Sequence, residues 1–206
     1  MSGIIYLSGH VNPKLPPDVG LMMTERSGHI LPEGRVWAAD NGCFATPHLF
    51  DPLTYIGWLA KHQPATDRCL FATMPDVVGN AKATLAKLQP WPRIIRALGY
   101  KAALVAQDGL EALPVPWDEL DCLFIGGSTE WKLGDHATDL IRAAKDRGKW
   151  VHAGRVNSLR RLRHVHWQGC DSADGTFCAF GPDVNIPRMA GWLQSIQAQP
   201  MLEGMV

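Results

Sequence analysis

Short apolar segments alternate with longer amphipathic segments along the 206 residues of this chain, which limits the fold to a few architectures. Each apolar segment is bounded by Gly, Pro or a polar residue, as expected of strands that are buried on both faces. The predicted strands are Ile4–Leu7, Val36–Ala39, Cys69–Thr73, Ala102–Ala106, Cys122–Ile125, Trp150–Ala153 and a short one that ends near Asp171, with an eighth candidate at Val19–Thr24. The predicted helices are Pro52–His62, Asn80–Leu98, Gly134–Arg147, Ser158–His164 and Pro187–Gln197.

Helix boundaries are marked by several residues. Asn80 is a predicted N-cap, and Gly99 and Gly148 stand where helices are expected to stop. Pro90 and Pro92 are expected to kink or split the helix that they interrupt, because proline lacks the N–H that an internal helical position requires.

Alternation of strands and helices predicts a parallel sheet with right-handed crossovers. Eight strands favour a minimal (β/α)8 barrel of the TIM type, and 206 residues is so short for this α/β fold that some helices must be short or missing. A doubly wound open sheet is the alternative, but the chain has neither GxGxxG after its first strand nor GxxxxGK[ST]. No repeat, low-complexity tract or linker interrupts the pattern, so residues 1–206 are predicted to form a single domain.

Composition excludes several classes of protein. Hydrophobic residues make up 46% and charged residues 19%, which excludes an intrinsically disordered chain. Twenty basic and twenty acidic residues cancel, so the chain is no general polycation, although a local basic groove stays open. No apolar run reaches the roughly 20 residues that cross a bilayer, and the N-terminus lacks the pattern of a secretory signal. We therefore expect a cytoplasmic protein without membrane contact.

The cysteines carry no metal or disulfide pattern. They are odd in number and lack CxxC spacing, and they are Cys43, Cys69, Cys122, Cys170 and Cys178. Reduced thiols in the core are the expected state. No zinc or iron–sulfur spacing is present, so the sequence predicts neither a metal site nor a cofactor.

Polar residues and glycines follow many of the predicted strands. The segments concerned are Asp40-Asn41-Gly42-Cys43-Phe44, Met74-Pro75-Asp76, Gln107-Asp108-Gly109, Gly126-Gly127-Ser128, Gly154-Arg155 and Asp171-Ser172-Ala173-Asp174-Gly175. In a parallel barrel the carboxyl ends of the strands meet at one rim, where active sites are built. The sequence therefore predicts a site at this rim.

Each residue taken alone also fits a local structural role. Asp40 could form a turn, Asp76 could cap a helix, and Asp108 precedes a glycine as in many turns. The two glycines could allow a tight bend, and Asp171 and Asp174 could pair with nearby arginines. Convergence of all these groups on one rim is what favours a site over these separate explanations.

The chemistry of such a rim is specific. A carboxylate can attack an electrophilic sugar carbon while a second acid or base moves protons at the leaving group. Gly126 and Gly127 allow close approach of a flat heterocycle to the backbone, because they carry no side chain. Asp76 and Gln107 supply the acceptors and donors that the edge of a guanine requires.

The ordered set of motifs resembles the tRNA-guanine transglycosylase superfamily. Asp40-Asn41-Gly42-Cys43-Phe44 resembles the Asp-Ser-Gly-Gly-Phe segment of that family, and Asp76 falls where the family keeps a guanine-recognising aspartate. Gln107 resembles the glutamine of Val-Gln-Gly, and Gly126-Gly127-Ser128 resembles Gly-Gly-Leu. Asp171-Ser172-Ala173-Asp174 is similar to Asp-Met-Phe-Asp, so the resemblance spans residues 40–174.

This resemblance implies a TIM barrel that exchanges guanine for a 7-deazaguanine through a covalent aspartyl-glycosyl intermediate. Asp174 would be the nucleophile at the sugar C1′, and Asp40 would be the acid/base partner for the departing and arriving bases. The residues implied to hold the base are Asp76, Gln107, Gly126, Gly127 and Ser128, with Cys43 and Phe44 lining or stacking on the pocket. No cofactor is implied.

Three departures from the family bear on the substrate. The zinc-binding cysteine cluster near the C-terminus is absent, and Gly175-Thr176-Phe177-Cys178 replaces the Pro-Thr-Arg stretch after the nucleophile. The chain is also far shorter than the tRNA enzymes. It is therefore most similar to the compact DpdA-type enzymes of phages and mobile elements, which implies DNA rather than tRNA as the polymer and a base such as preQ0 as the second substrate. A phage-encoded protein would act in the host cytoplasm.

A basic stretch lies beside the proposed active-site strand. Its members are Arg155, Arg160, Arg161 and Arg163, followed by His164 and His166. The arginines could contact the phosphates of a nucleic acid, or they could form a solvated helix face. His152 lies on a predicted strand and is expected to be a core or pocket-wall histidine rather than a general base.

Three functions remain open from the sequence alone. The preferred one is base exchange in DNA, with tRNA as the alternative polymer. The second is hydrolysis of a nucleoside or sugar by the same carboxylates with water as the acceptor. The third is a protein that binds a nucleobase or nucleic acid without catalysis.

Overall fold

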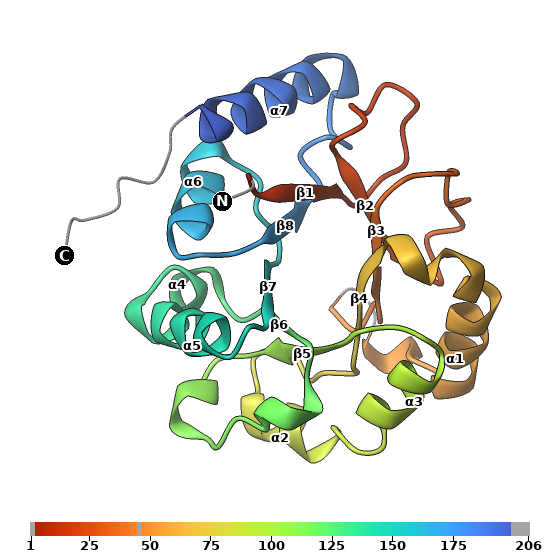
Figure 1. Cartoon of the computed structure of the whole chain (residues 1–206), viewed down its shortest axis with the longest axis vertical. Coiled ribbons are helices and arrows are strands. Elements are labelled where there is room, and N and C mark those ends of the chain that lie inside the picture. Colours follow the sequence, from red (N-terminus) through yellow and green to blue (C-terminus); the bar gives the residue numbers. More distant parts are fainter. Residues whose placement is uncertain (1–2, 45–46, 199–206) are drawn as a thin grey trace.

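The chain folds into a closed barrel of eight parallel strands in chain order (Figure 1). The computed structural model describes residues 3–44 and 47–198. The strands are β1 (Ile5–Ser8), β2 (Gly20–Thr24), β3 (Trp37–Asp40), β4 (Cys69–Thr73), β5 (Ala102–Ala106), β6 (Cys122–Ile125), β7 (Trp150–Ala153) and β8 (Ser172–Gly175). Pairing of β1 with β8 closes the barrel, which confirms the predicted (β/α)8 fold and excludes the open sheet.

Most predicted strands are confirmed with small shifts. β4, β5, β6 and β7 have the predicted bounds, and the eighth candidate forms β2. β1 and β3 each begin and end one residue later than predicted, so Ser8 and Asp40 belong to strands. The strand ends differ from the prediction because hydrogen bonding to neighbouring strands sets where a strand stops. The local sequence does not specify that pairing.

The prediction for the last strand was wrong. Its predicted end, Asp171, lies before β8, which covers Ser172–Gly175. The Asp171 carboxylate pairs with Lys145 at 2.6 Å and accepts a hydrogen bond from the backbone N–H of Val151 at 2.7 Å. Ser-Ala-Asp-Gly has little intrinsic preference for a strand, so its conformation is imposed by pairing with β1 and β7.

Helices lie outside the barrel (Figure 1). They are α1 (Pro52–Lys61), α2 (Ala81–Ala86), α3 (Trp91–Ala97), α4 (Thr129–Lys132), α5 (Asp135–Asp146), α6 (Leu159–Trp167) and α7 (Pro182–Gln197), with short 3₁₀ turns η1 (Pro47–Leu49), η2 (Gln63–Arg68), η3 (Leu110–Ala112) and η4 (Trp117–Glu119). Residues 9–19 and 25–36 connect strands without a helix, as the short chain requires.

Several helix boundaries follow the predicted signals. Asn80 caps α2 by accepting a hydrogen bond from the Ala83 N–H, and the predicted split before Trp91 separates α2 from α3. α7 begins five residues before the predicted start, at Pro182, because Pro187 is accommodated inside the helix. α6 extends beyond its predicted end to Trp167.

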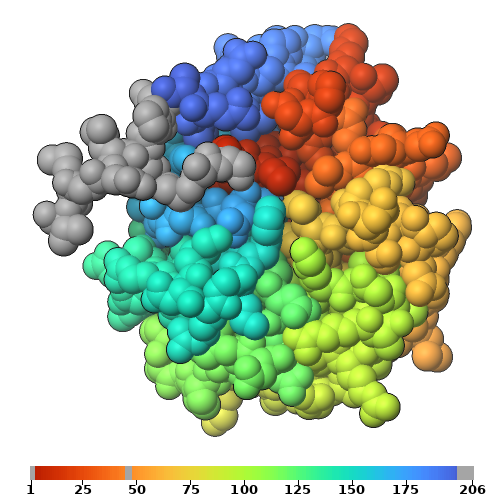
Figure 2. Space-filling view, viewed as in Figure 1, coloured from red at the N-terminus to blue at the C-terminus, as the bar shows by residue number. Residues whose placement is uncertain are grey.

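Strand residues alternate between two apolar layers. One cluster fills the barrel interior and consists of Leu7, Met22, Ala38, Phe71, Ala103 and Cys122. The larger cluster packs the outer strand faces against the helices. Figure 2 shows the segments following one another round the molecule in chain order. Because Ala38 faces inward, Asp40 two residues later faces inward as well, at the carboxyl end of its strand.

Candidate active site

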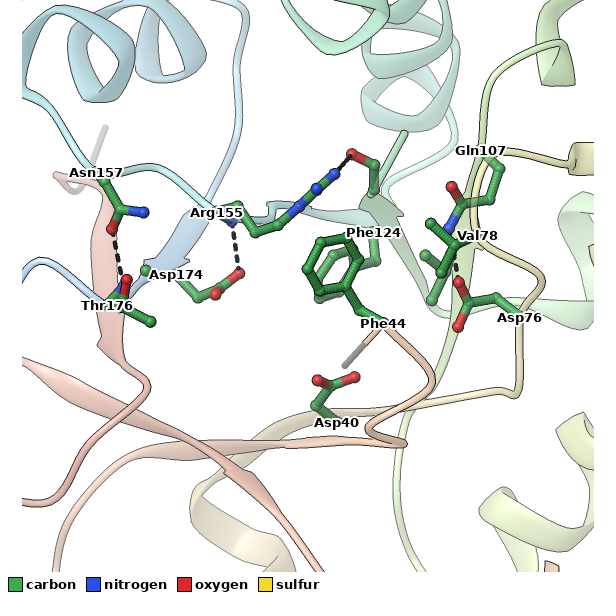
Figure 3. A pocket seen from close by; sticks show the side chains of 13 residues that line it. Asp40, Phe44, Asp76, Val78, Gln107, Phe124, Arg155, Asn157, Asp174 and Thr176 are labelled. Carbon is green, nitrogen blue, oxygen red and sulfur yellow. Dashed lines mark hydrogen bonds between the residues drawn. The ribbon is translucent and has the colours of Figure 1, made fainter. Parts of the chain in front are cut away.

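A cavity of about 340 Å³ opens at the carboxyl ends of the strands (Figure 3). Ligand pockets commonly have volumes of roughly 300–1,000 Å³. The predicted site residues in its wall are Asp40, Phe44, Asp76, Gln107, Gly126, Arg155 and Asp174. In Figure 3, Asp174 lies on the opposite side of the cavity from Asp76 and Gln107, with Phe44 and Asp40 between them.

Asp40 is the last residue of β3, and its surroundings favour the protonated form of its carboxyl group. Its Oδ1 atom accepts a hydrogen bond from the Thr73 hydroxyl at 3.4 Å. Burial, together with the negative charges of Asp174 and Asp76, raises the pKa of Asp40 to about 7. A carboxyl with this pKa can give and take a proton near neutral pH.

Asp174 belongs to β8 and faces Asp40 across the cavity. Its Oδ1 atom accepts hydrogen bonds from His152 Nε2 at 3.0 Å and from the Arg155 backbone N–H at 3.2 Å. Within the described part of the chain, no hydrogen bond reaches the other carboxylate oxygen, Oδ2. That oxygen is therefore available to a reacting atom in the cavity.

Asp76 is the centre of a buried polar network. Gln107 Nε2 donates a hydrogen bond to its Oδ2 at 2.6 Å, and Asn41 Nδ2 donates to its Oδ1 at 3.1 Å. The Asn41 amide also donates to the Met74 carbonyl at 2.7 Å, which ties the end of β3 to the end of β4. Burial raises the pKa of Asp76, while the two amide donors oppose that shift.

Arg155 spans the cavity wall beside Asp174. Its guanidinium lies 4.3 Å above the Phe44 ring and donates hydrogen bonds to the carbonyls of Gly126 and Gly127. The Arg155 backbone has a φ of 59°, a left-handed conformation that costs a residue with a side chain about 1 kcal/mol or more. The Arg155 N–H thereby points at Asp174.

Gly126 lines the cavity but offers no free backbone donor. Its N–H donates to the Ala106 carbonyl in the barrel ladder, and its carbonyl accepts from Arg155. A Cβ atom on Gly126 would lie 2.8 Å from Val105 and 3.1 Å from the Gln107 amide nitrogen. Glycine is therefore required here by close packing inside the protein, and its N–H is not free to bind a heterocycle.

Three residues predicted to hold the base do not line the cavity. Cys43 is 3% exposed and its N–H donates to Asn41 at 2.7 Å. Gly127 packs against Trp131, where a Cβ atom would lie 2.4 Å from the indole. Ser128 caps α4, and its N–H and hydroxyl donate to Asp108 at 2.7 and 2.6 Å. All three contact other protein groups instead, because proximity in sequence to a pocket residue does not fix which way a residue faces.

The predicted basic stretch divides between two cavities. Arg155 lines the first, whereas the other three arginines line a second cavity of about 1110 Å³ together with His164, His166 and Trp167. The two cavities share no lining residue. The tryptophan is 79% exposed, so this second cavity combines cations with an exposed aromatic face.

Sequence reasoning missed several residues of the first cavity. Its wall also contains Val78, Val105, Phe124, Asn157, Gly175 and Thr176. Asn157 Oδ1 accepts hydrogen bonds from the N–H groups of Thr176 and Phe177 at 2.8 and 3.0 Å, which fixes the chain after β8. Alternation along the strands could have placed Phe124 on the inner face, but no sequence signal predicts the role of Asn157.

Two buried ionisable side chains, Lys132 and His152, lie beneath the rim. Lys132 is 3% exposed and donates to the Gly154 carbonyl, and burial lowers its pKa to about 8. His152 is fully buried, which confirms the prediction of a core histidine, and it contacts Asp174.

Within residues 3–44 and 47–198, no three His, Cys, Asp or Glu side chains gather as metal ligands would. All five cysteines are buried free thiols, as predicted. None of the helices in these residues is both long and apolar enough to cross a bilayer.

Comparisons with known proteins identify no family. No protein-family model and no curated protein matches the chain. Similar solved structures include Klebsiella pneumoniae BlrP1 in complex with manganese and cyclic di-GMP, with 16% identity and a TM-score of 0.44 over 70% of this chain and 38% of BlrP1. Bacillus subtilis YkuI, a protein with an EAL domain, has 14% identity and a TM-score of 0.43 over 88% of this chain and 44% of YkuI. A GH113 β-1,4-mannanase has 11% identity and a TM-score of 0.46 over 86% of this chain and 74% of the mannanase. The chain spans less than half the length of BlrP1 and YkuI.

Proposed function

We propose that this protein is a base-exchange transglycosylase that replaces guanine by a 7-deazaguanine in DNA. One observation carries the proposal: Asp40, a buried carboxyl with a raised pKa, and Asp174, a carboxyl with one oxygen that receives no hydrogen bond from the described residues, line one cavity whose other side is a carboxylate–amide network. In enzymes, a carboxyl whose surroundings raise its pKa can serve as the acid beside a second carboxyl that acts as the nucleophile. The resemblance of the motifs from Asp40 to Asp174 supplies the reaction class.

Exchange proceeds in two displacements at C1′ of the sugar. In the first, Asp174 Oδ2 attacks C1′, the bond from C1′ to N9 breaks, and its electron pair leaves with guanine, which takes a proton from Asp40. In the second, N9 of the 7-deazaguanine attacks C1′ and transfers its proton to Asp40, while the bond from C1′ to Oδ2 breaks. Asp40 and Asp174 return to their starting states, so no co-reactant is consumed.

The far wall of the cavity has the groups needed to bind a purine. The Asp76 carboxylate can accept from the N1–H and exocyclic amino group of guanine, and Gln107 and Asn41 hold it in place. A 7-deazaguanine keeps both of those donors, so one wall serves the departing and the arriving base. Phe44 and Phe124 provide apolar faces against which a flat ring can pack.

The test follows labelled guanine into oligonucleotides. The protein is incubated with labelled guanine or preQ0 and with either DNA or tRNA, and the nucleosides are analysed by mass spectrometry. Exchange into DNA is the expected result. Exchange into tRNA alone would show that the substrate is tRNA rather than DNA. Release of base without exchange would show a hydrolase, and neither reaction with intact binding would show a binding protein.

Asp174→Asn is expected to abolish both exchange and a denaturation-resistant protein–DNA adduct, because the amide lacks a nucleophilic carboxylate oxygen. Asp183→Asn is the matched control, since Asp183 forms an exposed ion pair with Lys14 and does not line the cavity. Exchange by Asp174→Asn at the wild-type rate would remove Asp174 as the nucleophile.

A further inference from the structure

A continuous chain of hydrogen bonds runs beneath Asp174 between two neighbouring strands. Trp150 and His152 share the inner face of β7, and Ser172 and Asp174 share the inner face of β8, with His152 directly opposite Ser172 in the register. Trp150 Nε1 lies 2.9 Å from Ser172 Oγ, which lies 2.8 Å from His152 Nδ1. His152 Nε2 lies 3.0 Å from Asp174 Oδ1.

The direction of this chain follows from its first member. An indole N–H only donates, so Ser172 Oγ accepts from Trp150 and its own hydrogen is directed to His152 Nδ1. Nδ1 is then the unprotonated nitrogen of the ring, and Nε2 carries the hydrogen that is donated to Asp174. The reverse order would leave the Ser172 hydrogen without an acceptor in a site that is fully buried.

The environment of His152 favours its neutral form. Burial lowers the pKa of His152, and the positive charge of Lys132 acts in the same direction, whereas Asp174 opposes the shift. The Phe71 and Phe124 rings lie 4.9 and 4.5 Å from the imidazole, centroid to centroid, and prevent it from turning. The tautomer and the orientation of the ring are thus both fixed.

We propose that Trp150, Ser172 and His152 form a one-directional hydrogen-bond chain that makes His152 a positioning residue for Asp174. The chain holds Oδ1, together with the Arg155 N–H, and so presents Oδ2 to the cavity as the attacking oxygen. The catalytic role of His152 rests on the proposed transglycosylase function. The assignment of its tautomer is independent of that function.

The same donors act on the covalent intermediate. In the glycosyl ester, Oδ1 becomes the carbonyl oxygen and still accepts from His152 and Arg155. When the bond from C1′ to Oδ2 breaks, its electron pair returns to the carboxylate and is shared with Oδ1, where these two N–H groups stabilise it. Loss of the His152 donor therefore slows departure of Asp174 and shifts the protein toward the ester.

The tautomer is tested on the free protein by ¹⁵N NMR of the histidine rings, with His152 identified by its absence from the His152→Gln spectrum. A single neutral tautomer with the proton on Nε2 is expected at neutral pH. Ser172→Ala is expected to populate the other tautomer, because Nδ1 loses its donor. A ring protonated on Nδ1, or a doubly protonated ring at pH 7, would overturn the proposal.

The catalytic effect is tested with His152→Leu, which removes the donor, and His152→Gln, whose amide retains one. His152→Leu is expected to lower the exchange rate about 100-fold, the usual cost of losing one preorganised donor. In His152→Leu the KM for the base should stay constant, because the cavity wall at Asp76 is unchanged. The covalent protein–DNA adduct should accumulate. His152→Gln should recover part of the rate.

The control for these variants is His136→Gln on α5, which is not part of the hydrogen-bond chain. Thermal unfolding establishes that each variant is folded. A folded His152→Leu that exchanges base at the wild-type rate without accumulating adduct would overturn the positioning role. If the wild-type protein exchanges no base, the proposed function fails while the NMR measurement still decides the tautomer.

Discussion

Asp40 and Asp174 are the same residue type in two different surroundings. Burial and two neighbouring carboxylates keep a proton on Asp40 up to about pH 7. Asp174 instead receives two N–H donors on one oxygen, from His152 and from the backbone of Arg155. The proposed proton donor and the proposed nucleophile thus differ in surroundings although they line the same cavity.

Replacing Asp40 is expected to change the pH dependence of stability. The folded pKa of about 7 lies above the ordinary value of 3.8, so the folded state loses stability relative to the unfolded state as pH rises from about 4 to about 7. Asp40→Asn removes that loss, and its stability advantage over wild type should grow by roughly 2 kcal/mol between pH 5 and pH 8. Urea unfolding at both pH values measures it, with Asp183→Asn as the control. An advantage that does not vary with pH would contradict the raised pKa.

At the scale of elements, the end of β8 is the tightest junction of the site. A Cβ atom on Gly175 would lie 2.3 Å from Asn157 Oδ1, 2.5 Å from the Tyr6 hydroxyl and 2.7 Å from the Val156 carbonyl. The Tyr6 hydroxyl donates to that same carbonyl at 3.2 Å, which joins β1 to the loop after β7. Close contact of these segments keeps Asp174 at the rim.

Gly175→Ala is therefore expected to destabilise the protein by about 2–3 kcal/mol, because none of the three crowded groups can move without breaking a hydrogen bond. Gly191→Ala in α7 is the matched control, since its Cβ atom would meet nothing within 4 Å. That change should stabilise the protein by about 0.5–1 kcal/mol through helix propensity. Chemical denaturation compares the two variants, and equal effects would mean that Gly175 is not sterically constrained.

At the scale of the whole molecule, a net charge of zero conceals a division of charge between two cavities. Carboxyl groups gather in the first cavity, and cationic side chains line the second, along α6. Basic grooves that also carry an aromatic face are typical of surfaces that bind nucleic-acid backbones. We expect the second cavity to hold phosphates of the polymer.

Salt dependence tests this surface. In the double variant Arg160→Gln/Arg161→Gln, the slope of the logarithm of the DNA-binding constant against the logarithm of salt concentration should become shallower by about 2, because each phosphate contact contributes roughly 0.9. Arg142→Gln, which removes an exposed arginine of α5, is the control and should leave the slope unchanged. Binding that is independent of salt, or a slope that the double variant does not change, would show that α6 is only a solvated face.

The amino-acid sequence by itself determined the barrel, since eight apolar segments spaced by amphipathic ones leave few other folds, and it placed Asp40, Asp76, Gln107 and Asp174 at one rim. Only the tertiary structure decided side-chain direction and proton state. Cys43, Gly127 and Ser128 do not line the cavity, and His152 enters the site through contacts between β7 and β8. The physical reason is that a strand fixes the side of each residue by alternation alone, whereas burial, hydrogen-bond direction and pKa depend on partners brought in by distant segments.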